Sequence, residues 1–356
     1  MHRQYIITIV ILIVSLSTVH ANSVCYRTGD CTNDDTRQID IQDTATETID
    51  FTEPDVSALT PNTNLMYDRW YHRVNARTEV YDAPNGNVVR VIEEGFNFVT
   101  VLSNENGWTR INGDEWVRSE VLTDTSWVVS RFTGVEVPAE GFEQTMAWAL
   151  VNMYPSPEPG AGPSENLDLI PRYTRLYIHD TVVVDGYNWY LVDEGKWVHQ
   201  FRVALSEPLE TVPEAVDTEL WVGIDLYEQV LTVYRDETPL FTTLVATGLP
   251  RWPTYEGTFH IYFRNPREYM SWGTVGDDFY SLEEVPWTMF FDEGRALHGA
   301  YWHDGFGYRR SHGCVNMSIT DAHWLYQLVA DEMGSFRSAD YETGPAVYVY
   351  STGEYD

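Results

Sequence analysis

The stretch that says most about this chain runs from His298-Gly299 to Ser311-His312-Gly313-Cys314-Val315-Asn316. Cys314 follows His298 by sixteen residues and His312 by two. A thiol becomes a good nucleophile only as a thiolate, and a nearby imidazole can take its proton. The small residues beside the cysteine leave backbone N–H groups able to turn toward whatever the sulfur attacks. The pattern therefore indicates covalent acyl chemistry, although the cysteine count alone equally allows a buried, inert thiol.

The N-terminus of the chain predicts export. Arg3 precedes an apolar run from Ile6 to Val14, and Val19-His20-Ala21 suits a signal peptidase. Residues 1–21 are therefore predicted to be a signal peptide, with an uncleaved anchor as the alternative. We expect a protein of the periplasm, the cell wall or the extracellular space. In such an oxidising compartment, Cys25 and Cys31 are candidates for a small-loop disulfide, which leaves Cys314 over.

The charge balance excludes some partners. The 356 residues contain 54 acidic and 22 basic side chains, a net charge of −32. Nucleic acid and anionic membrane surfaces would both be repelled, so we expect neither as a partner, beyond the signal segment's own membrane contact.

Two copies of one β pattern follow an acidic segment. Residues 22–67 are predicted to be a solvated acidic linker. In residues 68–124, Trp108 and Trp116-Val117 flank an Asn112-Gly113 turn, and Trp189 and Trp197-Val198 repeat this spacing in residues 142–208. The two segments resemble bacterial SH3-like modules and are predicted to be small β-barrels. The resemblance implies binding of wall polymers or positioning of a catalytic domain; the alternative is that most of these aromatic residues only fill the barrel cores.

Residues 216–351 read as a third, mainly β unit. Strands are expected at 220–226, 229–234, 241–247 and 346–350. Thr320-Asp321 is expected to cap a helix whose inner face carries Trp324, Leu325, Leu328 and Val329. Cys314 then lies in a loop between the sheet and the helix, where catalytic groups are often found.

This unit resembles the YkuD-type L,D-transpeptidase catalytic domain. The resemblance is carried by Pro253–Phe259, Val285–Met289, His298-Gly299 and the motif from Ser311 to Asn316. It implies a β-sandwich-like domain with a short helix. One departure is the segment Tyr262–Glu284, which we expect to form a lid over the acyl-donor groove.

The resemblance also implies a reaction on peptidoglycan stem peptides, without a metal or an organic cofactor. Cys314 is expected to be the nucleophile, His298 the proton acceptor and donor, and the backbone carbonyl of Gly299 the group that orients His298. His312 and Gly313, with Cys314, are expected at the oxyanion. A second stem's amine would resolve the thioester into a 3→3 cross-link after release of terminal D-Ala.

Four further residues are candidates for substrate binding. Ser311 and Asn316 are expected to shape the loop or reach the peptide, and Arg309 and Arg310 to hold a carboxylate or pair with surface acids. His312 is equally open to a structural role. His303 and His323 are interpreted as bystanders.

Other functions stay open at this point. Water as the acceptor would make the protein an L,D-carboxypeptidase, and an inactive catalytic unit would leave a wall-binding protein. A zinc site built from His298, His303, His312 and Cys314 is a weaker alternative, because the His-x-Cys spacing is cramped. A cysteine peptidase shares the nucleophile but lacks the surrounding order of motifs.

Overall fold

The computed structural model describes residues 49–334 and 344–354. The predicted signal peptide (1–21) and the Cys25–Cys31 disulfide lie outside these residues. Within them, no helix is both long and apolar enough to cross a membrane.

The described end of the predicted acidic linker is anchored at a few apolar residues. Val56 and Met66 are buried, and α1 (Thr63–Met66) ends this segment. The Leu59 N–H donates to the Gly134 carbonyl at 3.2 Å. Most other residues of the segment are exposed, and the buried apolar side chains hold it against the neighbouring strands.

Residues 68–124, which we call the first module, form a run of antiparallel strands. They are β1 (Trp70–Val74), β2 (Thr78–Tyr81), β3 (Val88–Ile92), β4 (Phe96–Glu105), β5 (Trp108–Ile111), β6 (Glu115–Arg118) and β7 (Leu122–Asp124). Asn106-Gly107 and Asn112-Gly113 make the β4–β5 and β5–β6 turns, all with positive φ. Asn-Gly pairs favour such turns because both central residues must adopt left-handed backbone angles.

Residues 142–208, the second module, contain two small sheets ordered β10-β9-β14 and β11-β12-β13. Their strands are β9 (Met146–Ala149), β10 (Arg175–Tyr177), β11 (Asp180–Val184), β12 (Tyr187–Asp193), β13 (Lys196–His199) and β14 (Val203–Ser206). The predicted repeat is visible, because in each module a hairpin leads through a 3₁₀ turn into a strand, at Ser119–Val121 and at Gln200–Arg202. The strand pairing in the described residues does not close either module into a barrel.

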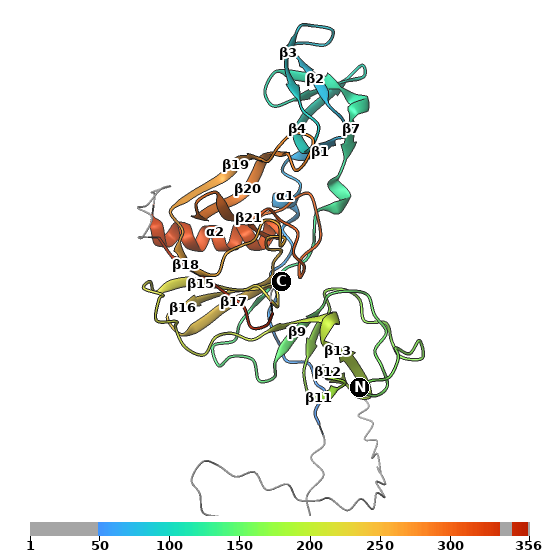
Figure 1. Ribbon diagram of the computed structural model, residues 1–356, viewed down its shortest axis with the longest axis vertical. Coiled ribbons are helices and arrows are strands. Elements are labelled where there is room, and N and C mark those ends of the chain that lie inside the picture. Colours follow the sequence, from blue (N-terminus) through green and yellow to red (C-terminus); the bar gives the residue numbers. More distant parts are fainter. Residues whose placement is uncertain (1–48, 335–343, 355–356) are drawn as a thin grey trace, which may run out of the picture. The chain divides into compact units, whose positions relative to one another are not determined.

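The C-terminal unit (216–351) packs two sheets face to face with one long helix. Its elements are β15 (Leu220–Asp225), β16 (Val230–Arg235), β17 (Thr238–Leu244), β18 (Gly257–His260), β19 (Phe263–Trp272), β20 (Tyr280–Asp292), β21 (Arg295–Gly299), β22 (Val315–Met317), α2 (Ile319–Met333) and β23 (Ala346–Tyr350). One sheet has the order β18-β23-β15-β16-β17-β8, where β8 is Val135–Glu136. The other contains β19, β20, β21 and β22, and α2 lies between the two sheets (Figure 1).

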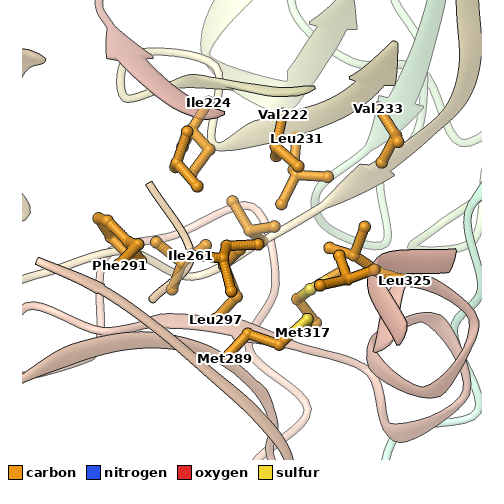
Figure 2. Close-up of a cluster of buried hydrophobic side chains, with 14 of the residues drawn as sticks. Val222, Ile224, Leu231, Val233, Ile261, Met289, Phe291, Leu297, Met317 and Leu325 are labelled. Atoms are coloured by element: carbon orange, nitrogen blue, oxygen red, sulfur yellow. The ribbon is translucent and has the colours of Figure 1, made fainter. Parts of the chain in front are cut away.

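The apolar core of this unit lies between the sheets. Figure 2 shows Val222 and Leu231 of the first sheet facing Leu297 of the second, with Leu325 of α2 beside them. These four side chains are fully buried. Burial of each large aliphatic side chain contributes about 1.5–3 kcal/mol, so this layer holds β21 and β22, and with them the His298 and Cys314 segments, in place.

The predicted helix is present with a different cap and a rotated inner face. Its N-cap is Ser318, whose hydroxyl accepts the Asp321 N–H at 3.1 Å, and not Thr320. Leu325 and Val329 are buried as expected, whereas Trp324 and Leu328 are only partly buried. Ser318 serves as the N-cap because its backbone is extended, as the backbone of an N-cap residue normally is.

The second sheet of the C-terminal unit continues into the first module. β20 pairs in parallel with β4, from Tyr280 opposite Phe96 to Leu282 opposite Phe98. The buried Glu283 carboxylate accepts the Thr100 N–H at 2.8 Å across this junction. The first module is therefore joined to the C-terminal unit by backbone pairing and not by a flexible connection.

Candidate active site

Strand pairing brings the two motif segments together. β21 ends in His298-Gly299, and β22 begins directly after Cys314. The two strands pair in parallel, with Leu297 opposite Val315 and His298 opposite Asn316. Neighbouring strands lie about 4.8 Å apart, so residues sixteen positions apart in the chain become neighbours across the sheet.

A pocket of about 510 Å³ opens beside these strand ends. Six of the predicted site residues line it: His298, Arg310, Ser311, His312, Cys314 and Asn316. The other lining residues are Arg73, Phe96, Met270, Tyr280, Leu282, Trp302 and His303. Arg309 does not reach it and borders a separate hollow beside Pro253 and Tyr255. The structure thus separates the two arginines that the sequence could not tell apart.

The imidazole of His298 is held by its neighbour's carbonyl. His298 is buried, and its Nδ1 lies 3.1 Å from the Gly299 carbonyl oxygen. A carbonyl can only accept, so Nδ1 carries the proton and Nε2 keeps its lone pair. Burial lowers the pKa of His298 to about 4, while the Gly299 bond acts in the opposite direction. His298 is therefore unprotonated at neutral pH, and Nε2 is the ring nitrogen that can accept a proton.

The Cys314 thiol is also neutral at rest. Burial raises its pKa to about 11, opposed by the backbone N–H of Ala296 and the nearby Arg295 guanidinium. The sulfur lies 4.0 Å from the Gly294 carbonyl oxygen, to which a thiol S–H can donate weakly. With the thiol pKa high and the imidazole pKa low, the site rests as a neutral pair and not as a thiolate–imidazolium pair.

The cysteine loop is tied to itself through Ser311. The Ser311 hydroxyl donates to the Cys314 carbonyl at 2.5 Å and accepts the Gly313 N–H at 3.0 Å. Gly313 has φ +107°, and a Cβ there would lie 2.8 Å from Nε of Arg295. Only glycine fits this position without strain. The Gly313 N–H is already engaged, so the oxyanion role predicted for it requires this bond to give way.

The turn noticed upstream supports the same loop. The Thr254 hydroxyl accepts the Gly248 N–H at 3.0 Å and donates to the Gly313 carbonyl at 2.9 Å. Thr254 is buried, so these bonds are shielded from water. The Pro253–Phe259 motif therefore helps to position the cysteine loop through the bond from Thr254 to Gly313.

His312 is held by stacking and not by hydrogen bonds. Its ring lies 3.8 Å from that of Trp252, nearly parallel, and 5.1 Å from that of Tyr280. Its Nε2 is buried without a hydrogen-bond partner among the described residues. Burial lowers its pKa. The ring lines the pocket, while the hydrogen bonds that fix the loop are made by Ser311 and Thr254.

His303, which the sequence analysis interprets as a bystander, lines the pocket and has a hydrogen-bond partner at each ring nitrogen. His303 is buried beside the pocket, and its Nδ1 accepts the Gly305 N–H at 3.0 Å. Its pKa is lowered to about 3 by burial, so the ring is neutral and its proton sits on Nε2. That nitrogen lies 2.9 Å from the Asn316 amide, which must turn its oxygen toward it. The Asn316 NH₂ is then left to donate elsewhere.

Sequence reasoning also missed Arg295. It lies three residues before His298 and donates to the Pro253 carbonyl at 3.2 Å and to Asp292 at 2.8 Å. Its position on the strand that ends in His298 was the available signal. By contrast, His323 of α2 lies outside the pocket, where its ring packs against that of Trp287 of β20.

The Tyr262–Glu284 segment forms a β-hairpin and one wall of the pocket. It contains β19 and the start of β20, and Met270, Tyr280 and Leu282 line the pocket. Trp272 at the hairpin end is 52% exposed and lies 6.0 Å from the His312 ring. The segment expected to act as a lid therefore contacts the site directly.

Metal ligation was the main chemical alternative. Across residues 49–334 and 344–354, no three His, Cys, Asp or Glu side chains group in a way that could hold a metal ion.

Comparison with known proteins supports one family for the C-terminal unit. Residues 219–349 match the YkuD family model, described as the L,D-transpeptidase catalytic domain. "L,D-transpeptidase 1" of Mycobacterium tuberculosis is 26% identical over 156 residues, which are 40% of this chain and 62% of that protein. A Bacillus subtilis protein named "Putative L,D-transpeptidase YciB" is 22% identical over 134 residues, 33% of this chain and 66% of the relative. The chain thus spans less than two thirds of the length of these relatives.

Solved structures give a weaker likeness. The catalytic domain of an Enterococcus faecium (E. faecium) L,D-transpeptidase is 23% identical, with 39% of this chain and 100% of that chain covered and a TM-score of 0.32. The family match and the two curated relatives thus agree that residues 219–349 are similar to the L,D-transpeptidase catalytic domain of the YkuD family.

Proposed function

We propose that this protein is an exported peptidoglycan L,D-transpeptidase that forms 3→3 cross-links through a thioester on Cys314. One observation carries the proposal: Cys314 and His298 line the same pocket, and Gly299 leaves Nε2 of His298 as the free base. A nucleophile, a base and a group that orients the base form the usual arrangement for acyl transfer.

The first half of the reaction forms the thioester. The Cys314 sulfur attacks the carbonyl that joins the third and fourth residues of a stem tetrapeptide, while Nε2 of His298 takes the thiol proton. Because both groups are neutral at rest, proton transfer accompanies the attack. The oxyanion is stabilised by N–H donors of the cysteine loop, with His312 beside them in the pocket lining. Collapse breaks the peptide bond, and His298 returns the proton to the departing D-Ala amine.

The second half resolves the thioester. The side-chain amine of a second stem attacks the thioester carbonyl and passes a proton to His298, and the proton returns to the sulfur as it leaves. Water in place of the amine gives the carboxypeptidase reaction. Arg310, which lines the pocket, is proposed to bind a substrate carboxylate, and Asn316, in the same lining, to contact the peptide.

The rest of the chain is proposed to bring this site to the wall. Export by the predicted signal peptide places it on the outer side of the membrane. The two β modules are proposed to be SH3-like and to hold the enzyme on wall polymer. The recurring order of hairpin, 3₁₀ turn and strand supports a common origin for both. Tyr154, Trp189 and Trp197 of the second module border one hollow, which suits a sugar or peptide ligand.

Acylation by a carbapenem tests the nucleophile. Intact-mass measurement should show one adduct on the wild-type protein, mapped to the peptide that contains Cys314, and none on Cys314→Ala. An adduct on folded Cys314→Ala, or an unmodified wild type, would refute the assignment.

A muropeptide assay tests the base and the acceptor. D-Ala release and dimer formation should fall by about 10²–10⁴-fold in His298→Ala. His323→Ala is the matched control, because that imidazole lies outside the pocket. Retained activity in His298→Ala would assign the base elsewhere. Release of D-Ala without dimers would make the protein a carboxypeptidase, and a folded protein with neither product would leave a wall-binding role.

A further inference from the structure

The first module contributes to the pocket that holds Cys314. Arg73 of β1 and Phe96 at the start of β4 both line it. Both residues lie far outside the family match, which begins at residue 219. They are therefore features of this chain's architecture and not of the catalytic domain by itself.

The module is held firmly enough to act as a wall of the site. Beyond the β4–β20 pairing, the Phe96 N–H donates to the Phe279 carbonyl at 2.9 Å. The ring of Tyr71, two residues before Arg73, stacks on that of Tyr301 with centroids 3.5 Å apart. Successive residues of a strand point to opposite sides at fixed spacing, so anchoring β1 and β4 also fixes where Arg73 and Phe96 lie.

The guanidinium of Arg73 is available to a ligand. Four of the module's five other arginines have a carboxylate within ion-pair distance: Arg69, Arg77, Arg90 and Arg110. For Arg73 no such partner lies among residues 49–334 and 344–354, and its guanidinium sits 5.5 Å from the centre of the Phe96 ring. Arg73 is exposed. The aromatic ring steadies the planar group while leaving its N–H donors unused.

The charge of the pocket points to an anionic ligand. Two arginines, and no Asp or Glu, are found among the thirteen described residues that line it. This is notable in a chain with 54 acidic and 22 basic residues. A guanidinium binds a carboxylate through two parallel hydrogen bonds, whereas the rest of this acidic surface repels one.

We propose that Arg73, supported by Phe96, binds a free carboxylate of the peptide that Cys314 attacks. The first module then determines substrate specificity in addition to any wall binding. Because that peptide is the acyl donor of the proposed transpeptidase, the site builds on the proposed function. Hydrogen bonds to charged groups contribute about 1.5–3 kcal/mol, which corresponds to about tenfold to a hundredfold in affinity.

Binding can be measured without turnover in the full-length Cys314→Ala protein. The probes are a stem tetrapeptide with its carboxylates free and the same peptide with its carboxylates amidated. Calorimetry should show that Cys314→Ala prefers the free peptide, and that adding Arg73→Gln weakens this peptide about tenfold or more while barely changing the amidated one. Arg73→Lys should recover part of the lost affinity, because lysine keeps the positive charge but cannot form the two parallel hydrogen bonds of a guanidinium.

Arg77→Gln is the matched control. It removes the same charge from the same module, but Arg77 pairs with Glu93 outside the pocket. It should leave both affinities unchanged, and unchanged melting temperatures should show that all variants are folded. The proposal is overturned if Arg73→Gln keeps the full preference for the free peptide, if it weakens both peptides equally, or if Cys314→Ala binds neither peptide. If binding depends on Arg73 but the wild-type protein does not convert the peptide, only the transpeptidase assignment is refuted.

Discussion

The pH dependence of Cys314 alkylation tests whether the site rests as a neutral pair. Burial puts the thiol pKa at about 11 against an ordinary value of 9.0. At pH 7.5 the thiolate fraction is then about 0.03%, compared with about 3% for an ordinary cysteine, a factor of about 100. Because only the thiolate reacts with iodoacetamide, the rate should rise about tenfold per pH unit through pH 10 without a plateau.

The assay is intact-mass measurement of carbamidomethylated Cys314 between pH 6 and pH 10.5, with tryptophan fluorescence to confirm folding at each pH. Burial of the sulfur also slows access, so the shape of the profile, and not the absolute rate, is the test. His298→Gln is the informative variant. Since the His298 pKa is about 4, the imidazole carries no charge across this range and its removal should not move the profile.

A different profile would refute this reasoning. A thiolate stabilised by a protonated His298 would give a plateau or inflection below pH 8 that disappears in His298→Gln. That result would mean a preformed ion pair, and the mechanism would no longer need proton transfer during attack.

Two further predictions concern stability. Ser311→Ala removes the hydroxyl that joins the Gly313 N–H to the Cys314 carbonyl. Leaving both groups unpaired should lower the free energy of unfolding by about 2–5 kcal/mol. An unchanged denaturant midpoint would mean that water replaces the hydroxyl. Asp321 is fully buried, and its pKa is raised to about 7 from an ordinary 3.8, so the folded state holds its proton more tightly and stability should fall as pH rises from about 4 to about 7. Calorimetric melting temperatures at pH 5.5 and pH 8 should therefore differ less in Asp321→Asn than in the wild type, and an equal difference would contradict the assignment.

Local sequence signals predicted much of the fold. The Asn112-Gly113 turn formed where expected, because a tight hairpin depends on the backbone angles of two residues. The helix was found but its cap was misplaced from Ser318 to Thr320, since several neighbouring residues could serve as the cap. Barrel closure was not found, because it depends on pairing between strands distant in sequence.

The candidate site divides in the same way. Sequence alone predicted Cys314, His298 and the Gly299 carbonyl as one site, and the parallel pairing of β21 with β22 brings these segments, sixteen positions apart in the chain, side by side. Only the tertiary structure placed Arg73 against the pocket and gave His303 its bond to Asn316. The physical reason is that β4 and β20 pair through backbone groups common to all residues, so no side-chain pattern records which distant strand supplies the wall of the site.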